Sequence, residues 1–222
     1  MKKGLTELVF ILDRSGSMSG LEKDTIGGFN SMIEKQKAED GEAIVSTVLF
    51  DDQMKVIHDR IPMGQVKLLT SKDYYVGGCT ALLDAMGKTI KHINQVQKSL
   101  PKEERPEKTM FIITTDGQEN SSHDFTYEKI KKMVEKKQNK KSWEFLFLGA
   151  NIDAIGTAAG LGIRADRAVN YRSDSVGTAV NYRALSSAVS CFRKAESPMA
   201  AKACMVNWDK EIVADYEKRK AE

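Results

Sequence analysis

The stretch Leu8-Val9-Phe10-Ile11-Leu12-Asp13-Arg14-Ser15-Gly16-Ser17 decides the fold that the sequence predicts. Its first five residues are all apolar, which is the pattern of a strand buried on both faces of a parallel sheet. Its last five residues place one carboxylate and two hydroxyl groups on a tight loop. In open α/β sheets, ligands bind beyond the carboxyl ends of the strands. The stretch therefore predicts a central strand with a binding site at its end.

Further strands and helices alternate along the rest of the chain. Residues 110–113 and 145–148 repeat the buried-strand pattern, and a lysine-rich helix between them completes a βαβ unit. Residues 43–50 and 54–57 flank a turn, which predicts a hairpin with an antiparallel edge strand. Ala168-Val169 is a candidate final edge strand. The pattern predicts a doubly wound, Rossmann-like α/β fold with a mostly parallel sheet.

Apolar residues recur with helical spacing in several segments, which predicts helices on both faces of this sheet. They are residues 21–37, the segment of Leu82 to Val96, and residues 176–192. Gly27-Gly28 interrupts the first of these helices, and two glycines inside a helix cost roughly 1 kcal/mol each. Close packing of this helix against the sheet is the expected compensation.

The length of 222 residues fits one large domain with an appendage. We assign residues 1–196 to the domain and residues 197–222 to a C-terminal helical tail. The spacing of Trp208, Ile212 and Tyr216 predicts an amphipathic helix in this tail. This helix either docks on the domain's own surface, which is the simpler interpretation, or binds a partner.

Composition excludes several classes of protein. The net charge of +3, from 34 basic and 31 acidic residues, gives no reason to expect a nucleic-acid or membrane partner. No run of about 18 apolar residues occurs, and the N-terminal apolar run is too short for a signal peptide. Cys79, Cys191 and Cys204 are odd in number and form no CxxC pair, which argues against a disulfide framework or a cysteine zinc site. We expect a cytoplasmic protein in a reducing compartment.

Three loops at predicted strand ends carry oxygen-bearing side chains. Asp116 follows the strand of residues 110–113, and Thr80 follows Gly77-Gly78 at the start of a helix. The candidate ligands are Asp13, Ser15, Ser17, Thr80 and Asp116. Because all five are hard oxygen donors, the set suits Mg²⁺, or else Mn²⁺ or Ca²⁺, and does not suit zinc or copper. Gly16 and Gly77-Gly78 are expected to let these loops fold tightly.

Asp-x-Ser-Gly-Ser, a threonine after Gly-Gly, and Thr-Asp-Gly resemble the metal-ion-dependent adhesion site (MIDAS) of von Willebrand factor A (VWA) domains of the intracellular bacterial type. The resemblance covers about residues 4 to 195. It implies that Ser15, Ser17 and Thr80 bind the metal directly, and that Asp13 and Asp116 bind it directly or through water. It also implies an interaction module, not an enzyme, in which a protein partner's Asp or Glu completes the coordination. Cys79 stands where a small or variable residue is usual, and an exposed thiol there would make the site sensitive to oxidation.

Other interpretations of the same residues stay open at this point. A strand-end Asp13 opposite Asp116 also suits a metal-dependent phosphohydrolase, although Ser15 stands where aspartyl-phosphate enzymes carry a second aspartate. A third interpretation, which rests on family analogy alone, is that the chain is an accessory subunit of an ATP-driven or stress-response complex, as some intracellular bacterial relatives are. Ser17 and Thr80 could simply be helix N-caps. The sequence does not identify the partner or the oligomeric state.

Several charged residues have no assigned function. Seven lysines lie between Lys129 and Lys141, which could form a patch for nucleic acid or an acidic partner. They alternate with Glu128 and Glu135, so a solvated helix face is the favoured interpretation. Arg14 either steers an acidic ligand toward the site or points into solvent. The three histidines lack ligand spacing and receive no function.

Overall fold

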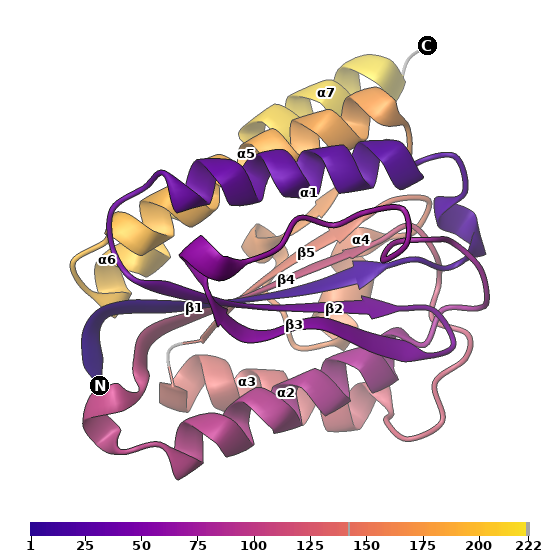
Figure 1. The fold of residues 1–222 in the computed structure, drawn as a ribbon. Helices are drawn as coiled ribbons and strands as arrows, with labels where there is room; N and C mark the ends of the chain where they lie inside the picture. Colours follow the sequence, from indigo (N-terminus) through magenta and orange to yellow (C-terminus); the bar gives the residue numbers. More distant parts are fainter. Residues whose placement is uncertain (142, 221–222) are drawn as a thin grey trace.

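A six-stranded mixed sheet forms the centre of the computed structural model, which describes residues 1–141 and 143–220 (Figure 1). The strand order is β3-β2-β1-β4-β5-β6. The strands are β1 (Lys2–Asp13), β2 (Ala43–Phe50), β3 (Met54–Pro62), β4 (Pro106–Thr115), β5 (Trp143–Gly149) and β6 (Ala168–Asn170). Only the edge strand β3 pairs antiparallel among the strands described. The predicted doubly wound sheet, with its antiparallel edge strand and its short final strand, is confirmed.

Helices cover both faces of this sheet (Figure 1). On one face lie α1 (Glu22–Lys37), α5 (Ser175–Lys194), α6 (Pro198–Ala203) and α7 (Lys210–Lys220). On the other face lie α2 (Leu82–Ser99), α3 (Tyr127–Lys141) and α4 (Ala154–Gly160). Strand β1 divides the two cores, because alternate side chains point to opposite faces. Phe10 belongs to the first hydrophobic cluster and its neighbour Ile11 to the second.

The order of the strands places β1 at the point where the chain direction across the sheet reverses. β1 pairs in parallel with β2 on one side and with β4 on the other. Connections therefore leave the carboxyl ends of β1 and β4 in opposite directions, which opens a crevice between their loops. Asp13 ends β1 and Asp116 directly follows β4. Both candidate carboxylates thus stand at the same edge of the sheet.

Close packing does explain one of the two glycines in α1, but the partner is a helix and not the sheet. A Cβ atom added to Gly28 would lie 2.2 Å from Cδ2 of Tyr182, which belongs to α5. A Cβ atom added to Gly27 would meet nothing within 4 Å. Sequence periodicity marks which residues are helical, but it does not reveal which element faces them. The glycine at position 28 therefore lets α1 and α5 approach each other.

The C-terminal segment packs on the domain. Trp208 and Ile212 are buried in the same hydrophobic cluster as Phe10, with exposed fractions of 7% and 1%. The indole Nε1 of Trp208 also donates a hydrogen bond of 3.2 Å to the carbonyl of Asp166.

Among the described residues, no helix is long and apolar enough to cross a membrane.

A disulfide joins Cys191 of α5 to Cys204, directly after α6. The expectation that the cysteines argue against a disulfide is therefore wrong for this pair. Only 13 positions separate them, and the reversal of the chain after α5 brings their Cα atoms to 5.7 Å. This distance is within the ordinary range for a disulfide. Their spacing in the sequence gives no sign of that reversal. Cys79 is free and exposed.

We predict opposite effects for alanine at the two neighbouring glycines of α1. Gly28→Ala should destabilise the protein by about 1–3 kcal/mol, because the new methyl group overlaps the Tyr182 ring. Gly27→Ala should stabilise it by about 0.5–1 kcal/mol, because alanine favours a helix and the site is open. Thermal unfolding of both variants tests this difference. Equal melting temperatures would contradict the packing described here.

A second prediction concerns adjacent residues of α7. Ile212→Ala should cost about 2–5 kcal/mol, because it leaves a cavity in the core beneath the helix. Val213→Ala should have little effect, because Val213 is 42% exposed. Denaturant unfolding of the two variants compares them directly. If Ile212→Ala unfolds like the wild-type protein, α7 does not dock on the domain in solution.

Candidate metal centre

The carboxylate of Asp13 is buried and held by two hydrogen bonds. Its Oδ1 accepts from the Ser15 amide at 2.7 Å, and its Oδ2 accepts from the Thr115 hydroxyl at 2.5 Å. The Tyr74 hydroxyl donates to the Asp13 carbonyl at 2.6 Å. Burial raises the pKa of Asp13 to about 6, although the hydrogen bonds from Thr115 and Ser15 oppose the shift. Asp13 is therefore fixed in position at the end of β1.

Three hydroxyl groups converge beside Gly117. The Oγ atoms of Ser15 and Ser17 are 3.0 Å apart. A Cβ atom added to Gly117 would lie 3.0 Å from the Ser17 Oγ, 3.0 Å from the Thr80 Oγ1 and 3.8 Å from the Ser15 Oγ. The side chains of two separate loops thus surround one small space, and the glycine leaves that space open.

Asp116 supplies a second buried carboxylate with an unused oxygen. Its Oδ2 accepts from the Ser173 hydroxyl at 3.0 Å. Its Oδ1 is buried and has no hydrogen-bond partner among the residues described. Burial raises the pKa of Asp116, and the hydrogen bond from Ser173 opposes the shift. A buried, unpartnered carboxylate oxygen is costly unless a cation or a donor satisfies it. The donor set therefore fits a hard divalent cation.

Backbone hydrogen bonds bring the loops of these residues together. The Gly16 amide donates to the Gly78 carbonyl at 3.2 Å, and the Gly77 amide donates to the Arg14 carbonyl at 3.0 Å. Gly78 has a φ of +71°, which favours glycine, as the sequence predicted. Gly16 has no such φ, and a Cβ atom there would make an ordinary contact of 3.5 Å. Neither the backbone conformation nor the space at position 16 therefore requires a glycine, contrary to the prediction.

The two hydroxyl residues are not helix caps. Ala81 occupies the N-cap position of α2, and Ser17 lies within the short 3-10 helix Gly16–Met18. Asn120 instead holds Thr80 in place, because its Oδ1 accepts from the Thr80 amide at 2.9 Å. The Asn120 amide also donates to the Thr80 carbonyl at 3.0 Å. The capping interpretation of Ser17 and Thr80 is wrong.

Sequence reasoning missed three residues that position the predicted ligands: Thr115, Asn120 and Ser173. Thr115 directly precedes Asp116, and Asn120 lies four positions after it. Their closeness to a predicted ligand in the sequence was a signal that they position it. Ser173 follows β6, the short final strand. The rule that ligands gather at carboxyl ends of parallel strands would have pointed to Ser173, had it been applied to that strand.

Arg14 neither points into solvent nor is free to steer a ligand. It is 4% exposed, and its guanidinium forms an ion pair of 2.9 Å with Asp51. The guanidinium also lies 4.5 Å from the centre of the Tyr75 ring. Both interpretations offered from the sequence are wrong, because the partner Asp51 lies on a different loop. Arg14 instead ties that loop to the site.

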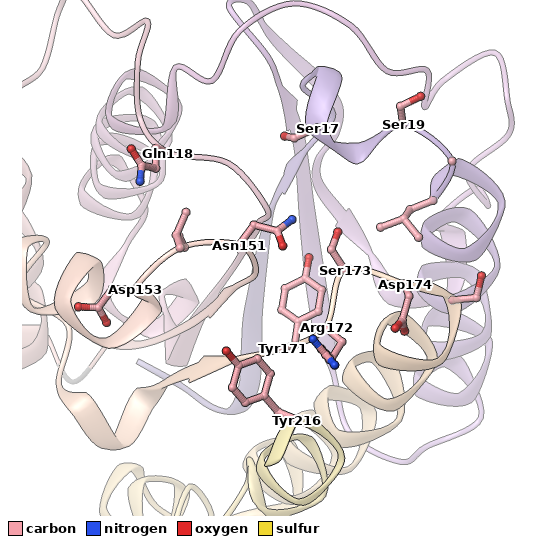
Figure 2. Close-up of a pocket in the computed structure, with 14 residues that line it drawn as sticks. Ser17, Ser19, Gln118, Asn151, Asp153, Tyr171, Arg172, Ser173, Asp174 and Tyr216 are labelled. Carbon is pink, nitrogen blue, oxygen red and sulfur yellow. The ribbon is translucent and has the colours of Figure 1, made fainter. Parts of the chain in front are cut away.

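An open pocket of about 810 Å³ lies beside the candidate ligands (Figure 2). Ser17 and Ser173 belong to its wall, so the pocket adjoins the hydroxyl cluster. Figure 2 shows Gln118, Asn151 and Tyr171 around the same space, with Tyr216 of α7 at its far side. These side chains are mostly polar. The pocket can therefore take a polar group that approaches the site from outside.

The described residues contain no cluster of three or more His, Cys, Asp or Glu side chains suited to a metal. The five predicted side chains do come from one edge of the sheet.

Comparison with known proteins gives structural relatives only. No protein-family model matches the chain, and no curated protein matches its sequence. A solved structure of a von Willebrand factor type A protein from Catenulispora acidiphila is 16% identical, with a TM-score of 0.53 over 84% of this chain and 43% of that one. Proximal thread matrix protein 1 from the mussel byssus, with a zinc-occupied MIDAS motif, is 14% identical. Its TM-score is 0.53 over 83% of this chain and 45% of that one. This chain spans less than half the length of each. At these identities the likeness shows a shared fold.

Two serines at the start of α5 and just before it test the hydrogen bonds that hold the predicted ligands in place. Ser173→Ala removes the donor to Asp116, so we expect Mn²⁺ affinity to fall about tenfold or more. Ser175→Ala is the control, because its hydroxyl donates to Asp24 on α1 instead. Calorimetric titration of both variants with Mn²⁺ measures the effect. Equal affinities would show that Ser173 does not position Asp116 for a cation.

Proposed function

We propose that this chain, which has the fold of von Willebrand factor A domains, is a metal-dependent interaction module whose bound Mg²⁺ accepts a carboxylate from a protein partner. Ser15, Ser17 and Thr80 would hold the ion directly, and Asp13 and Asp116 directly or through water. The single observation that carries the proposal is the convergence of three hydroxyls beside a buried carboxylate oxygen that has no partner.

The chemistry of this donor set favours Mg²⁺ and an anionic partner. Hydroxyl oxygens are neutral, so they do not offset the charge of a divalent cation. When the ion is bound, it supplies a Lewis-acidic position for an incoming oxygen. The adjoining polar pocket is open, so a partner side chain can reach the hydroxyl cluster from solvent. Asp or Glu matches both the charge and the preferred ligand atom.

The arrangement of Asp13 supports binding over hydrolysis. A phosphohydrolase of the aspartyl-phosphate type needs a free carboxylate oxygen as nucleophile and a nearby general acid or base. Both oxygens of Asp13 accept short hydrogen bonds, and Ser15 occupies the position of the second aspartate. The residues at this edge therefore suit a role in holding a cation.

Titration with Mn²⁺ and Mg²⁺ tests the metal site. We expect about one ion per chain, with binding lost in the Asp13→Ala, Ser15→Ala double variant. Gly117→Ala should also weaken binding strongly, because its methyl group would enter the space between the hydroxyls. Gly64→Ala is the matched control, since a Cβ atom there meets nothing within 4 Å. Unchanged Mn²⁺ affinity in Gly117→Ala would overturn the proposed site.

A separate assay tests whether the bound ion accepts a carboxylate. N-acetylaspartate amide should displace water from the Mn²⁺-loaded protein and so lower the paramagnetic relaxation of water protons. N-acetylasparagine amide has the same shape without the charge and should not. If both compounds act alike, the site does not select a carboxylate. Excess chelator should abolish the difference between them.

A further inference from the structure

The positive charge of this chain is concentrated in one layer. Helices α2 and α3 contain ten lysines and three acidic residues, a net charge of +7. The whole chain has a net charge of +3, so the remaining residues together carry −4. The two helices lie next to each other on one face of the sheet (Figure 1). That face therefore attracts anionic partners more strongly than the overall composition indicates.

Between these helices lies a groove of about 250 Å³ with an apolar floor. Ile90 of α2 and Met133 of α3 form the floor. The rim carries Lys91 and Lys98 on one side and Lys136 on the other, and no carboxylate belongs to the lining that the structure describes. An apolar groove with a cationic rim is unlike a solvated helix face, which was the interpretation favoured from the sequence.

The lysines of this groove differ in their surroundings. Lys137 is 7% exposed. Its ammonium group donates a hydrogen bond to the Asn94 side-chain oxygen and lies 4.5 Å from the centre of the Trp143 ring. Lys91 lies over the Phe125 ring at 4.4 Å. Within the part of the chain that the structure describes, neither Lys98 nor Lys136 forms an ion pair. Two of the rim's charges are thus available to a partner.

We propose that the α2–α3 groove is a second docking surface, which binds an acidic protein segment by taking up one of its apolar side chains. The lysine rim would pair with the Asp or Glu residues that flank this side chain, and Ile90 and Met133 would contact the side chain itself. This surface is separate from the metal centre. Lys98 lies near the C-terminal end of α2, whereas Thr80 precedes its N-terminal end.

The recessed floor favours a protein segment over a membrane or a nucleic acid. A membrane-binding face presents apolar side chains that protrude. Among the side chains described on these two helices, Tyr127, which is 40% exposed, is the only large apolar one that is exposed. Nucleic-acid phosphates need cations but no apolar groove, and single strands need exposed aromatic rings for stacking. A partner that brings its own apolar side chain fits both the charge and the shape.

Fluorescence anisotropy with two labelled peptides tests the proposal. Both peptides consist of Glu and Asp around one central residue, which is leucine in the first and serine in the second. We expect the leucine peptide to bind the full chain about tenfold more tightly, since one apolar side chain becomes buried. The triple variant Lys91→Glu, Lys98→Glu, Lys136→Glu reverses the charge of the rim. We expect its affinity for the leucine peptide to be at least about tenfold lower than that of the unchanged protein.

The triple variant Lys23→Glu, Lys35→Glu, Lys72→Glu is the control, because it makes the same charge change at exposed lysines elsewhere. Circular dichroism checks that both triple variants fold. Equal binding of the two peptides, equal losses in the two triple variants, or no saturable binding of the leucine peptide would each overturn the proposal. Binding to phosphatidylserine vesicles or duplex DNA in its place would assign the lysines to those partners. All these titrations are made in excess chelator, so carboxylate binding at the metal centre does not contribute to them.

Discussion

The hydrogen bond from Thr115 to Asp13 joins the carboxyl ends of β1 and β4, and the metal centre is arranged around it. β1 is one of the strands that lie between the two hydrophobic clusters, so it is packed on both faces. Ser15 and Ser17 follow Asp13 directly, and Asp116 follows Thr115. One buried contact between two strand ends therefore fixes four of the five candidate ligands. Thr80 arrives from a third loop, through its hydrogen bonds with Asn120.

This arrangement has an electrostatic cost in the absence of a cation. Asp13 and Asp116 are both buried, and the charge of Asp116 contributes to the raised pKa of Asp13. Because the folded pKa of Asp13, about 6, exceeds its ordinary value of 3.8, the free energy of unfolding falls as the pH rises between these values. The protein keeps two ionisable groups where they oppose folding. Such local conflict is common at functional sites, and a bound divalent cation would offset it.

The fold separates two surfaces of different chemistry. The edge at the carboxyl ends of the strands presents buried acidic groups, hydroxyls and an open polar pocket. The α2–α3 face presents lysines around an apolar groove, partway down the helices that lead away from that edge. A doubly wound sheet allows this separation, because loops build the edge whereas helix surfaces build the faces. The two proposed contacts can therefore be tested independently.

The sequence by itself determined the strands, the helices and the oxygen-only chemistry of the site. Continuous apolar runs such as residues 8–12 and the spacing of Leu82, Met86 and Ile90 are local patterns, and each element follows from its own residues. The position of Asp13, Thr80 and Asp116 at element ends was equally local. The convergence of Asp13 and Asp116 could be predicted because parallel strands end at one edge.

Only the tertiary structure decided which residues face one another across the fold. It paired Arg14 with Asp51, Ser173 with Asp116, Gly28 with Tyr182 and Cys191 with Cys204. It also changed the interpretation of the lysines of α3, because the apolar floor of their groove comes partly from α2. Such contacts depend on how packed elements approach each other in space. The periodicity of a single segment carries no information on its neighbour, so these pairings could not be derived from the sequence.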